Sequence, residues 1–218
     1  MPEPGPCDCP GCPNVFSLKA AEEDLRRYRR KGPDPSTQSL ISAIESQGID
    51  GASVLDIGGG IGAIQLELLA AGAATAELVD ATPSYVAVAR AEAERRGYGA
   101  RTRHLEGDFV ALANEVEQAD VVTLDRMVCC YSDMPRLVGR SLDHARRMIG
   151  LVYPRDVWWT RAMARGMAAF HRLTRDPVRW YIHSESALDA LIRGAGFERR
   201  VLRRHVLWQV ALYVRIGT

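Results

Sequence analysis

The stretch Val54-Leu55-Asp56-Ile57-Gly58-Gly59-Gly60-Ile61-Gly62 decides the fold. Its first four residues have the character of a buried strand, and the glycines that follow indicate a tight turn. Residues 63–71 come next and have the character of a helix. Glycines let the backbone approach a ligand closely, and the first turn of a helix offers free N–H groups. The stretch therefore predicts a cradle for a nucleotide-like ligand.

Strand and helix patterns alternate from residue 52 onward. We expect strands at 53–57, 76–80, 101–106, 120–125 and 149–153, and helices between them at 63–71, 83–96, 110–118 and 135–148. Helices at 156–174 and 184–193 then precede two closing strands near 199–205 and 206–215. This alternation predicts an α/β, Rossmann-like fold with a doubly wound, largely parallel sheet. The ligand of such a sheet binds outside the strand C-termini, beside the first strand.

Two helices are expected before this alternating region, within residues 17–50. Ser17 would cap the first, which would end before Gly32, and Ser36 or Thr37 would cap the second. Tyr28 and the basic run before Gly32 would lie beside the ligand cleft if these helices pack over it.

Residues 1–16 form a separate segment rich in Cys, Pro and Gly. Cys7, Cys9 and Cys12 have a C-x-C-x-x-C spacing, and their thiolates are candidate zinc ligands. Three ligands are one short of a closed zinc site, so a fourth would have to come from elsewhere in the chain, with Cys129 and Cys130 as candidates. The alternative is a flexible tail that carries cysteines without a metal.

The composition argues against several classes of function. The 218 residues carry a net charge of only +1, so bulk electrostatics gives no reason to expect a nucleic-acid partner. No run is long and apolar enough to span a membrane, and residues 1–6 do not resemble a secretory signal. We therefore expect a cytoplasmic protein whose five cysteines are mostly reduced.

Acidic residues at the ends of three expected strands narrow the choice of ligand. Asp56 ends the first strand, where a carboxylate would accept from an ammonium group and would repel a pyrophosphate. Asp80 ends the second strand, where a carboxylate can accept both ribose hydroxyls. Gly107-Asp108-Phe109 follows the third, where an acid would meet an adenine amine and an aromatic ring would stack nearby.

With these residues in this order, residues 52–156 resemble the class I S-adenosylmethionine (SAM)-dependent methyltransferases. The resemblance implies a seven-stranded sheet, mostly parallel with an antiparallel last strand. It also implies SAM as the cofactor, S-adenosylhomocysteine (SAH) as the product, and a methyltransferase domain over residues 17–218. The cofactor-binding residues that it implies are Asp56, Gly58, Gly59, Gly60, Gly62, Asp80, Ala81, Gly107, Asp108, Phe109 and Asp125.

Within this family the chain is loosely similar to the magnesium-protoporphyrin O-methyltransferases and to related bacterial small-molecule methyltransferases. The stretches Leu124-Asp125-Arg126-Met127-Val128 and Leu151-Val152-Tyr153-Pro154 carry that similarity. The N-terminal region differs from the porphyrin enzymes. We expect methyl transfer to a small-molecule acceptor, anionic or aromatic in character, with an insert at 156–183 covering the substrate side.

The substrate would be contacted by the N-terminal helices and by the segments after the fourth and fifth strands. The candidates are Tyr28, Arg126, Tyr131, Tyr153, Arg155, Trp158 and Trp159. The adjacent tryptophans suggest the wall or lid of an apolar pocket, and helix packing is the alternative. Candidates for a catalytic base are His171, Tyr131, Tyr153 and Asp125.

Two other functions stay open at this point. The cysteine segment is compatible with a catalytically inactive SAM-binding or metal-sensing protein. An NAD-dependent oxidoreductase shares the same strand–turn–helix unit, although the chain offers no Tyr-x-x-x-Lys pair to support it.

Overall fold

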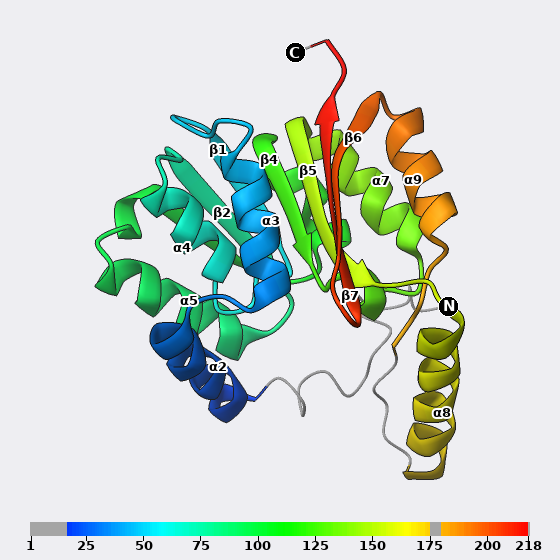
Figure 1. Ribbon diagram of the computed structural model, residues 1–218. Helices are drawn as coiled ribbons and strands as arrows, with labels where there is room; N and C mark the ends of the chain where they lie inside the picture. The colour runs from blue at the N-terminus through cyan, green and yellow to red at the C-terminus, as the bar shows by residue number, and fades with distance from the viewer. Residues whose placement is uncertain (1–16, 175–179, 218) are drawn as a thin grey trace.

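A seven-stranded sheet forms the centre of the molecule (Figure 1). The computed structural model describes residues 17–174 and 180–217, except for the side chains of residues 171–174. The strand order is β3-β2-β1-β4-β5-β7-β6. The strands are β1 (Ser53–Ile57), β2 (Thr75–Asp80), β3 (Thr102–Glu106), β4 (Ala119–Asp125), β5 (Ala145–Pro154), β6 (Phe197–Arg204) and β7 (Trp208–Arg215).

Only β7 breaks the parallel direction of the sheet. It pairs antiparallel with both β5 and β6, whereas β1 pairs parallel with β2 and β4. In the strand order, the chain moves from β1 to β2 and β3 on one side and from β4 to β5 on the other. Its winding direction therefore reverses between β1 and β4. The predicted Rossmann-like sheet, mostly parallel with an antiparallel last strand, is confirmed.

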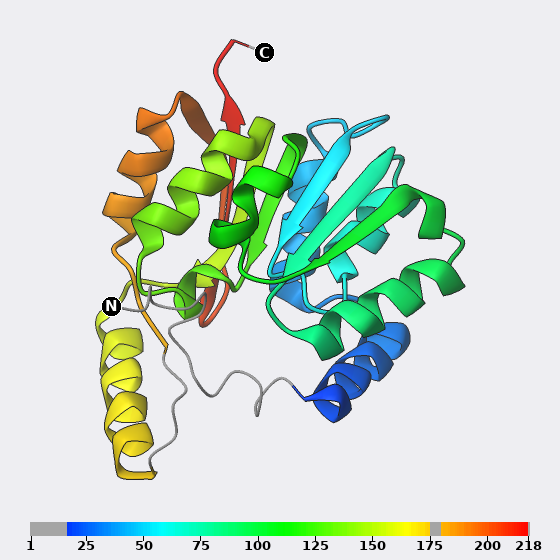
Figure 2. The ribbon, with the colours of Figure 1, turned by 180° about the vertical axis from the view of Figure 1, so that it is seen from behind.

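Helices cover both faces of the sheet (Figures 1 and 2). The helices are α2 (Leu18–Lys31), α3 (Pro35–Glu45), α4 (Ala63–Ala70), α5 (Pro83–Arg95), α6 (Phe109–Leu112), α7 (Met134–His144), α8 (Trp158–Thr174) and α9 (Glu185–Gly194), with short 3-10 turns η1 (Gly99–Arg101), η2 (Ala113–Glu115) and η3 (Val128–Cys130). Successive residues of a strand point to opposite faces of the sheet, so the hydrophobic core has one part on each face. Val54 and Val121 pack with α3 and α4, whereas Leu55 and Val122 pack with α7 and α9.

The expected helix at 135–148 is too long by four residues. Helix α7 ends at His144, whose ring nitrogens contact the carbonyl oxygens of Arg140 at 2.7 Å and Ala113 at 2.8 Å. Residues 145–148 belong to β5 instead. Ala145 pairs with β4, and its carbonyl oxygen accepts from the Arg215 guanidinium at 2.6 Å. These partners are distant in sequence, so local helix character does not decide the outcome.

The expected cap of the second helix is also wrong. Helix α3 begins after Asp34, because Pro35 occupies its first position and fixes φ there. Ser36 and Thr37 lie inside the first turn, and both side chains are buried. Ser17, in contrast, caps α2 as predicted, accepting from the Ala20 N–H at 3.4 Å.

Helices α2 and α8 lie beyond the edge where the parallel strands end (Figure 1). Glu92 of α5 holds α2 in place, because its fully buried carboxylate pairs with Arg29 at 2.5 Å. Arg95 binds the other oxygen of the same carboxylate at 2.7 Å. Helix α8 extends away from the sheet in both views. No helix among the described residues has the length and apolar character needed to cross a membrane.

Candidate functional site

A cleft opens at the C-terminal edge of the sheet, beyond the ends of β1 and β4. It has two lobes, of about 220 Å³ and 330 Å³, which together reach the size typical of cofactor sites, roughly 300–1,000 Å³. Gly58, Gly60, Tyr85, Asp125 and Arg126 line both lobes. The first lobe, beside α2, also contains Asp56, and the second also contains Asp80, Ala81, Gly107, Asp108 and Phe109.

The glycine turn brings backbone rather than side chains to the centre of this cleft. Gly60 has φ +56°, and a Cβ added there would meet nothing nearer than the Tyr85 ring at 3.6 Å. A Cβ on Gly59 would lie 2.5 Å from Asp56 Oδ2. Gly62 has φ +78° and precedes α4, so the first turn of that helix begins beside the cleft. The turn therefore leaves room for a ligand at Gly60. The missing side chain at Gly59 leaves room for the carboxylate of Asp56.

Asp56 is fully buried, yet only one of its oxygens has a partner. Oδ1 accepts from the Thr123 hydroxyl at 2.7 Å. Oδ2 is buried and has no hydrogen-bond partner among the described residues. Burial raises the pKa of Asp56 to about 7, against the lowering effect of the Thr123 hydrogen bond. A cationic donor in the first lobe would satisfy this oxygen, so the site fits the ammonium group of a cofactor.

Asp80 and Asp108 line the second lobe, and each accepts hydrogen bonds from backbone N–H groups there. Asp80 Oδ2 accepts from the Gly60 N–H at 3.0 Å, and Oδ1 accepts from the Thr82 N–H at 2.8 Å. Asp108 caps α6 through the Val110 N–H at 3.3 Å. Burial raises the pKa of both carboxyls. Both acids line a cavity whose walls are otherwise mostly apolar, as an adenosine moiety requires.

Asp125 and Arg126 lie where the two lobes meet. Asp125 Oδ2 accepts from the Thr37 hydroxyl at 2.5 Å, and Oδ1 lies 3.5 Å from Arg126 Nε. Arg126 has φ +59°, and no other non-glycine residue among those described has a positive φ. Its guanidinium donates to Asp34 Oδ2 at 2.9 Å and to the hydroxyls of Ser36 and Thr37 at 3.2 Å. The loop before α3 is thus fastened to the end of β4.

A third cavity of about 750 Å³ adjoins the cleft beyond Arg126. Arg126 also lies over the ring of Trp208, with its guanidinium carbon 5.3 Å from the ring centre. Trp208 packs edge-on against Trp180 at 6.1 Å, and both rings line the second lobe. An aromatic wall therefore exists, but it is formed by Trp180 and Trp208 and not by the adjacent pair that the sequence suggested.

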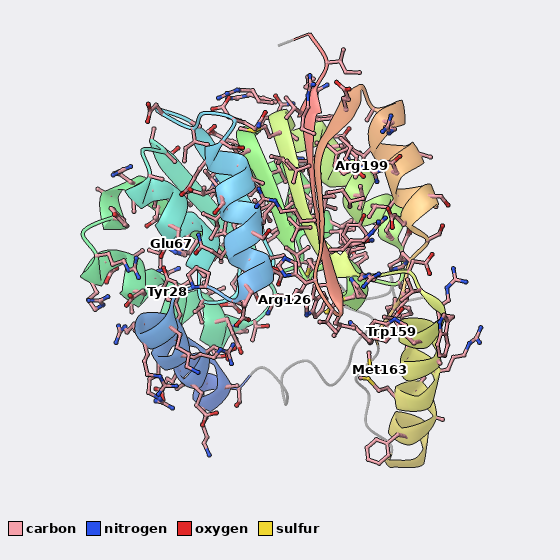
Figure 3. The ribbon with its side chains drawn as sticks, in the orientation of Figure 1. Tyr28, Glu67, Arg126, Trp159, Met163 and Arg199 are labelled. Carbon is pink, nitrogen blue, oxygen red and sulfur yellow. The ribbon has the colours of Figure 1, made fainter. Side chains whose placement is uncertain are left out.

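The structure brings some of the predicted substrate residues to these cavities. Tyr28 lines the first lobe, and its hydroxyl donates to Glu67 at 2.5 Å. Arg155 lines the third cavity. Figure 3 shows Tyr28 pointing toward Glu67, with Arg126 below the end of α3.

Other predicted substrate residues lie elsewhere. Tyr153 is 2% exposed and packs in the core toward α9, so its placement does not support a role in the cleft. Tyr131 donates to Asp108 at 3.2 Å and lines none of the three cavities. Trp158 and Trp159 are on α8, well apart from Tyr28, and Trp158 is 80% exposed.

Two predictions fall on parts of the chain that the structure does not describe. His171 is one of the four residues of α8 whose side chains are not described. Cys7, Cys9 and Cys12 lie in residues 1–16, outside the described ranges. Within those ranges, no group of three or more His, Cys, Asp or Glu residues could hold a metal ion.

Sequence reasoning missed several residues that shape the site. Thr123 donates to Asp56, Thr37 donates to Asp125, and Tyr85 lines both lobes while donating to Asp24 at 2.8 Å. Tyr85 lies in the first turn of the helix expected at 83–96, shortly after the predicted second strand, and this position was the available signal. Thr37 and Trp208 carry no comparable local signal.

Comparisons with known proteins agree with this geometry. Residues 54–149 match the family model described as "Methyltransferase domain". The structure is similar to that of magnesium protoporphyrin IX methyltransferase from Synechocystis PCC 6803 with bound SAH, with a TM-score of 0.70, 18% identity, and coverage of 95% of this chain and 99% of that one. It is also similar to mitomycin 7-O-methyltransferase, with a TM-score of 0.63, 19% identity, and coverage of 93% of this chain and 60% of that one. No curated protein matches the sequence.

Residues 54–149 are therefore similar to methyltransferase domains, and the described chain has the fold of these methyltransferases, in agreement with the resemblance that its motifs carry. These matches are to methyltransferases and give no support to the alternative of an NAD-dependent oxidoreductase.

Proposed function

We propose that this protein transfers the methyl group of SAM to a small-molecule acceptor, anionic or aromatic in character, that enters the cleft beside Arg126 and Trp208. The observation that carries the proposal is the half-partnered carboxylate of Asp56. It is buried at the glycine turn, at the edge of a cleft that also holds Asp80 and Asp108.

Asp56, Asp80 and Asp108 would divide the recognition of SAM between the two lobes. Asp56 Oδ2 would accept from the ammonium group in the first lobe, which explains a buried acid without a protein partner. Asp80 would accept the ribose hydroxyls, because it already fixes the Gly60 N–H at the same end of the cavity. Asp108 and Phe109 would border the adenine. Tyr131 supports this arrangement by donating to Asp108.

Bound SAM supplies a methyl group that is already activated on a sulfonium sulfur. The chain therefore has mainly to align the acceptor and to exclude water, and alignment alone can contribute a large part of the rate. Arg126 and Trp208 are positioned for this task, because both line the second lobe and the third cavity. The acceptor would lie between these two spaces.

Asp125 is the best-placed base among the described candidates. It lines both lobes, and burial raises its pKa, so its carboxylate binds a proton more readily than an exposed one. Burial also raises the pKa values of Tyr131 and Tyr153, which makes both hydroxyls harder to ionise. Asp125 would take the proton of an oxygen or nitrogen nucleophile as the methyl group transfers.

The structural neighbours support a small-molecule acceptor. Two of them are named for magnesium protoporphyrin IX and mitomycin, and both of these are small molecules.

Transfer of a tritiated methyl group from SAM into a metabolite extract tests the proposal directly. The wild-type protein should label a low-molecular-weight product, and Asp56→Asn should reduce the rate at sub-saturating SAM. Asp143→Asn, an exposed carboxylate distant from the cleft, is the matched control and should retain the wild-type rate. A protein that binds SAH but labels nothing would instead be a SAM-binding protein without catalysis.

A further inference from the structure

The third cavity is built from two segments that are distant in sequence. One wall is the start of α3, with Pro35 and Ser36, and the other is the turn between β6 and β7 that contains His205. Arg126 and Arg155 complete the lining, and Trp208 and Leu207 add apolar surface. The space is large enough for a ring system carrying a polar substituent.

The charge of this lining is mainly positive. Arg126, Arg155 and Arg204 line the cavity, and Asp34 is the one acid that lines it. Asp34 is already paired with Arg126 at 2.9 Å, and Arg204 is 3.7 Å from Glu185. Arg155 makes no ion pair with any residue that the structure describes, and its guanidinium contacts only the carbonyl oxygens of His205 and Val206 at 3.4 and 3.5 Å.

Two residues that line this cavity each have a side-chain nitrogen without a hydrogen-bond partner among the described residues. Arg155 Nε and His205 Nε2 are both buried, and neither has a partner among the described residues. Leaving a buried donor unpaired is unfavourable, and more so when the group is charged. An acceptor oxygen placed in the cavity would relieve both after a small adjustment of the side chains. These residues are thus ready for an anionic oxygen group.

The cavity is continuous with the proposed methyl-transfer site. Arg126 and Trp208 line the third cavity and also the second lobe of the cofactor cleft. A flat molecule packed on Trp208 would therefore reach both spaces at once. Its anionic end would lie toward Arg155, and its reacting atom toward the cofactor.

We propose that the third cavity is an anion subsite, in which Arg155 and His205 bind an anionic oxygen group of a flat acceptor whose ring packs against Trp208. The proposal rests on the proposed methyl transfer and adds the acceptor's chemical class: an aromatic molecule with a carboxylate or phosphate remote from the reacting atom. Arg155 supplies the charge, and His205, in the tautomer that carries a proton on Nε2, donates a hydrogen bond that an apolar group could not accept.

Calorimetric titrations in the presence of saturating SAH test this subsite. The probes are naphthoate, naphthyl phosphate and the neutral naphthamide, which share one ring system. At least one of the two anions should bind wild-type protein about tenfold or more tightly than the amide. The acid that binds identifies whether the subsite takes a carboxylate or a phosphate.

Variants then locate the binding. Arg155→Gln and His205→Phe should each remove most of the preference, with about a tenfold loss for Arg155→Gln, or roughly 1.4 kcal/mol. Arg203→Gln is the matched control. Arg203 is exposed in the neighbouring strand, bonds the Ser39 carbonyl oxygen at 3.4 Å and lines none of the three cavities, so this variant should bind like wild type.

The outcomes separate the two proposals. If SAH binds but neither anion binds more tightly than the amide, or if Arg155→Gln and His205→Phe both leave the preference intact, the anion subsite is wrong and the methyltransferase proposal stands. If SAH itself does not bind, the methyltransferase proposal fails, and the acceptor subsite fails with it.

Discussion

The Thr123 hydroxyl donates to Asp56 Oδ1 at 2.7 Å, while Asp56 Oδ2 lies buried without a hydrogen-bond partner among the described residues. The pair spans the neighbouring strands β1 and β4, at the position where the sheet reverses its winding. One oxygen of the carboxylate is therefore fixed by the fold, and the other is unpaired in a residue that lines the first lobe of the cleft. This asymmetry indicates that the acid is kept for a ligand.

The affinity for SAH should depend on pH through Asp56. Burial raises its pKa to about 7 in the free protein, and only the ionised carboxylate attracts an ammonium group. We expect wild-type affinity to weaken about tenfold as pH falls from about 8 to about 6. Asp56→Asn should bind weakly with a flat profile, whereas Asp143→Asn should follow wild type. A wild-type affinity that stays constant across this range would rule out Asp56 as the ammonium partner.

The stability of the free protein should depend on pH with the opposite sign. Because the folded pKa of Asp56 is raised, the folded state holds a proton that the unfolded state has already lost between about pH 4 and 7. Stability from this group is therefore present in acid and is lost as pH rises through 7. Through this group, the free energy of unfolding of the wild-type protein should fall by about 2 kcal/mol between pH 5 and pH 8, and Asp56→Asn should abolish that fall. Urea unfolding of both proteins at the two pH values measures it, and parallel pH profiles would contradict the burial argument.

Asp80→Ala should weaken SAH binding by ~1–3 kcal/mol, because charged hydrogen bonds to the ribose are lost. The variant also frees the Gly60 and Thr82 N–H groups, which Asp80 holds at 3.0 and 2.8 Å. Asp80→Asn keeps one acceptor oxygen and should fall between alanine and wild type in a calorimetric titration. Unchanged affinity in the alanine variant would mean that the ribose lies elsewhere.

Arg126→Lys should loosen the cleft although it preserves the charge. Arg126 uses its planar guanidinium to bind Asp34 and two hydroxyls at once, and a lysine ammonium cannot reproduce that geometry. We expect SAH binding to weaken about fivefold, roughly 1 kcal/mol, and hydrogen exchange of residues 32–37 to accelerate. Arg103→Lys, at an exposed arginine that pairs with Glu77, is the control and should change neither measurement. Normal exchange at 32–37 in the Arg126 variant would refute the anchoring role.

Local patterns were sufficient to predict which residues line the half of the cleft around the glycine turn. The glycine turn, Asp56 and Asp80 all lie at the ends of apolar strands, and chain order alone brings such ends to one edge of a parallel sheet. Ser36 and Thr37 show why the other half was harder. The same hydroxyls that suggest a helix cap instead bond Arg126 and Asp125, which are about ninety residues away.

The aromatic wall and one strand boundary depended on long-range packing in the same way. Trp158 and Trp159 are adjacent in the sequence, whereas Trp180 and Trp208 meet only because β7 lies between β5 and β6. Residues 145–148 continue a helical pattern but pair with β4, because the sheet satisfies their backbone groups.

Calorimetric titration of the purified protein with SAH, and separately with NAD, tests the central claim most directly. SAH should bind saturably with one site per chain, and NAD should give no saturable heat. Saturable NAD binding without any response to SAH would contradict the assignment of this cleft to SAM.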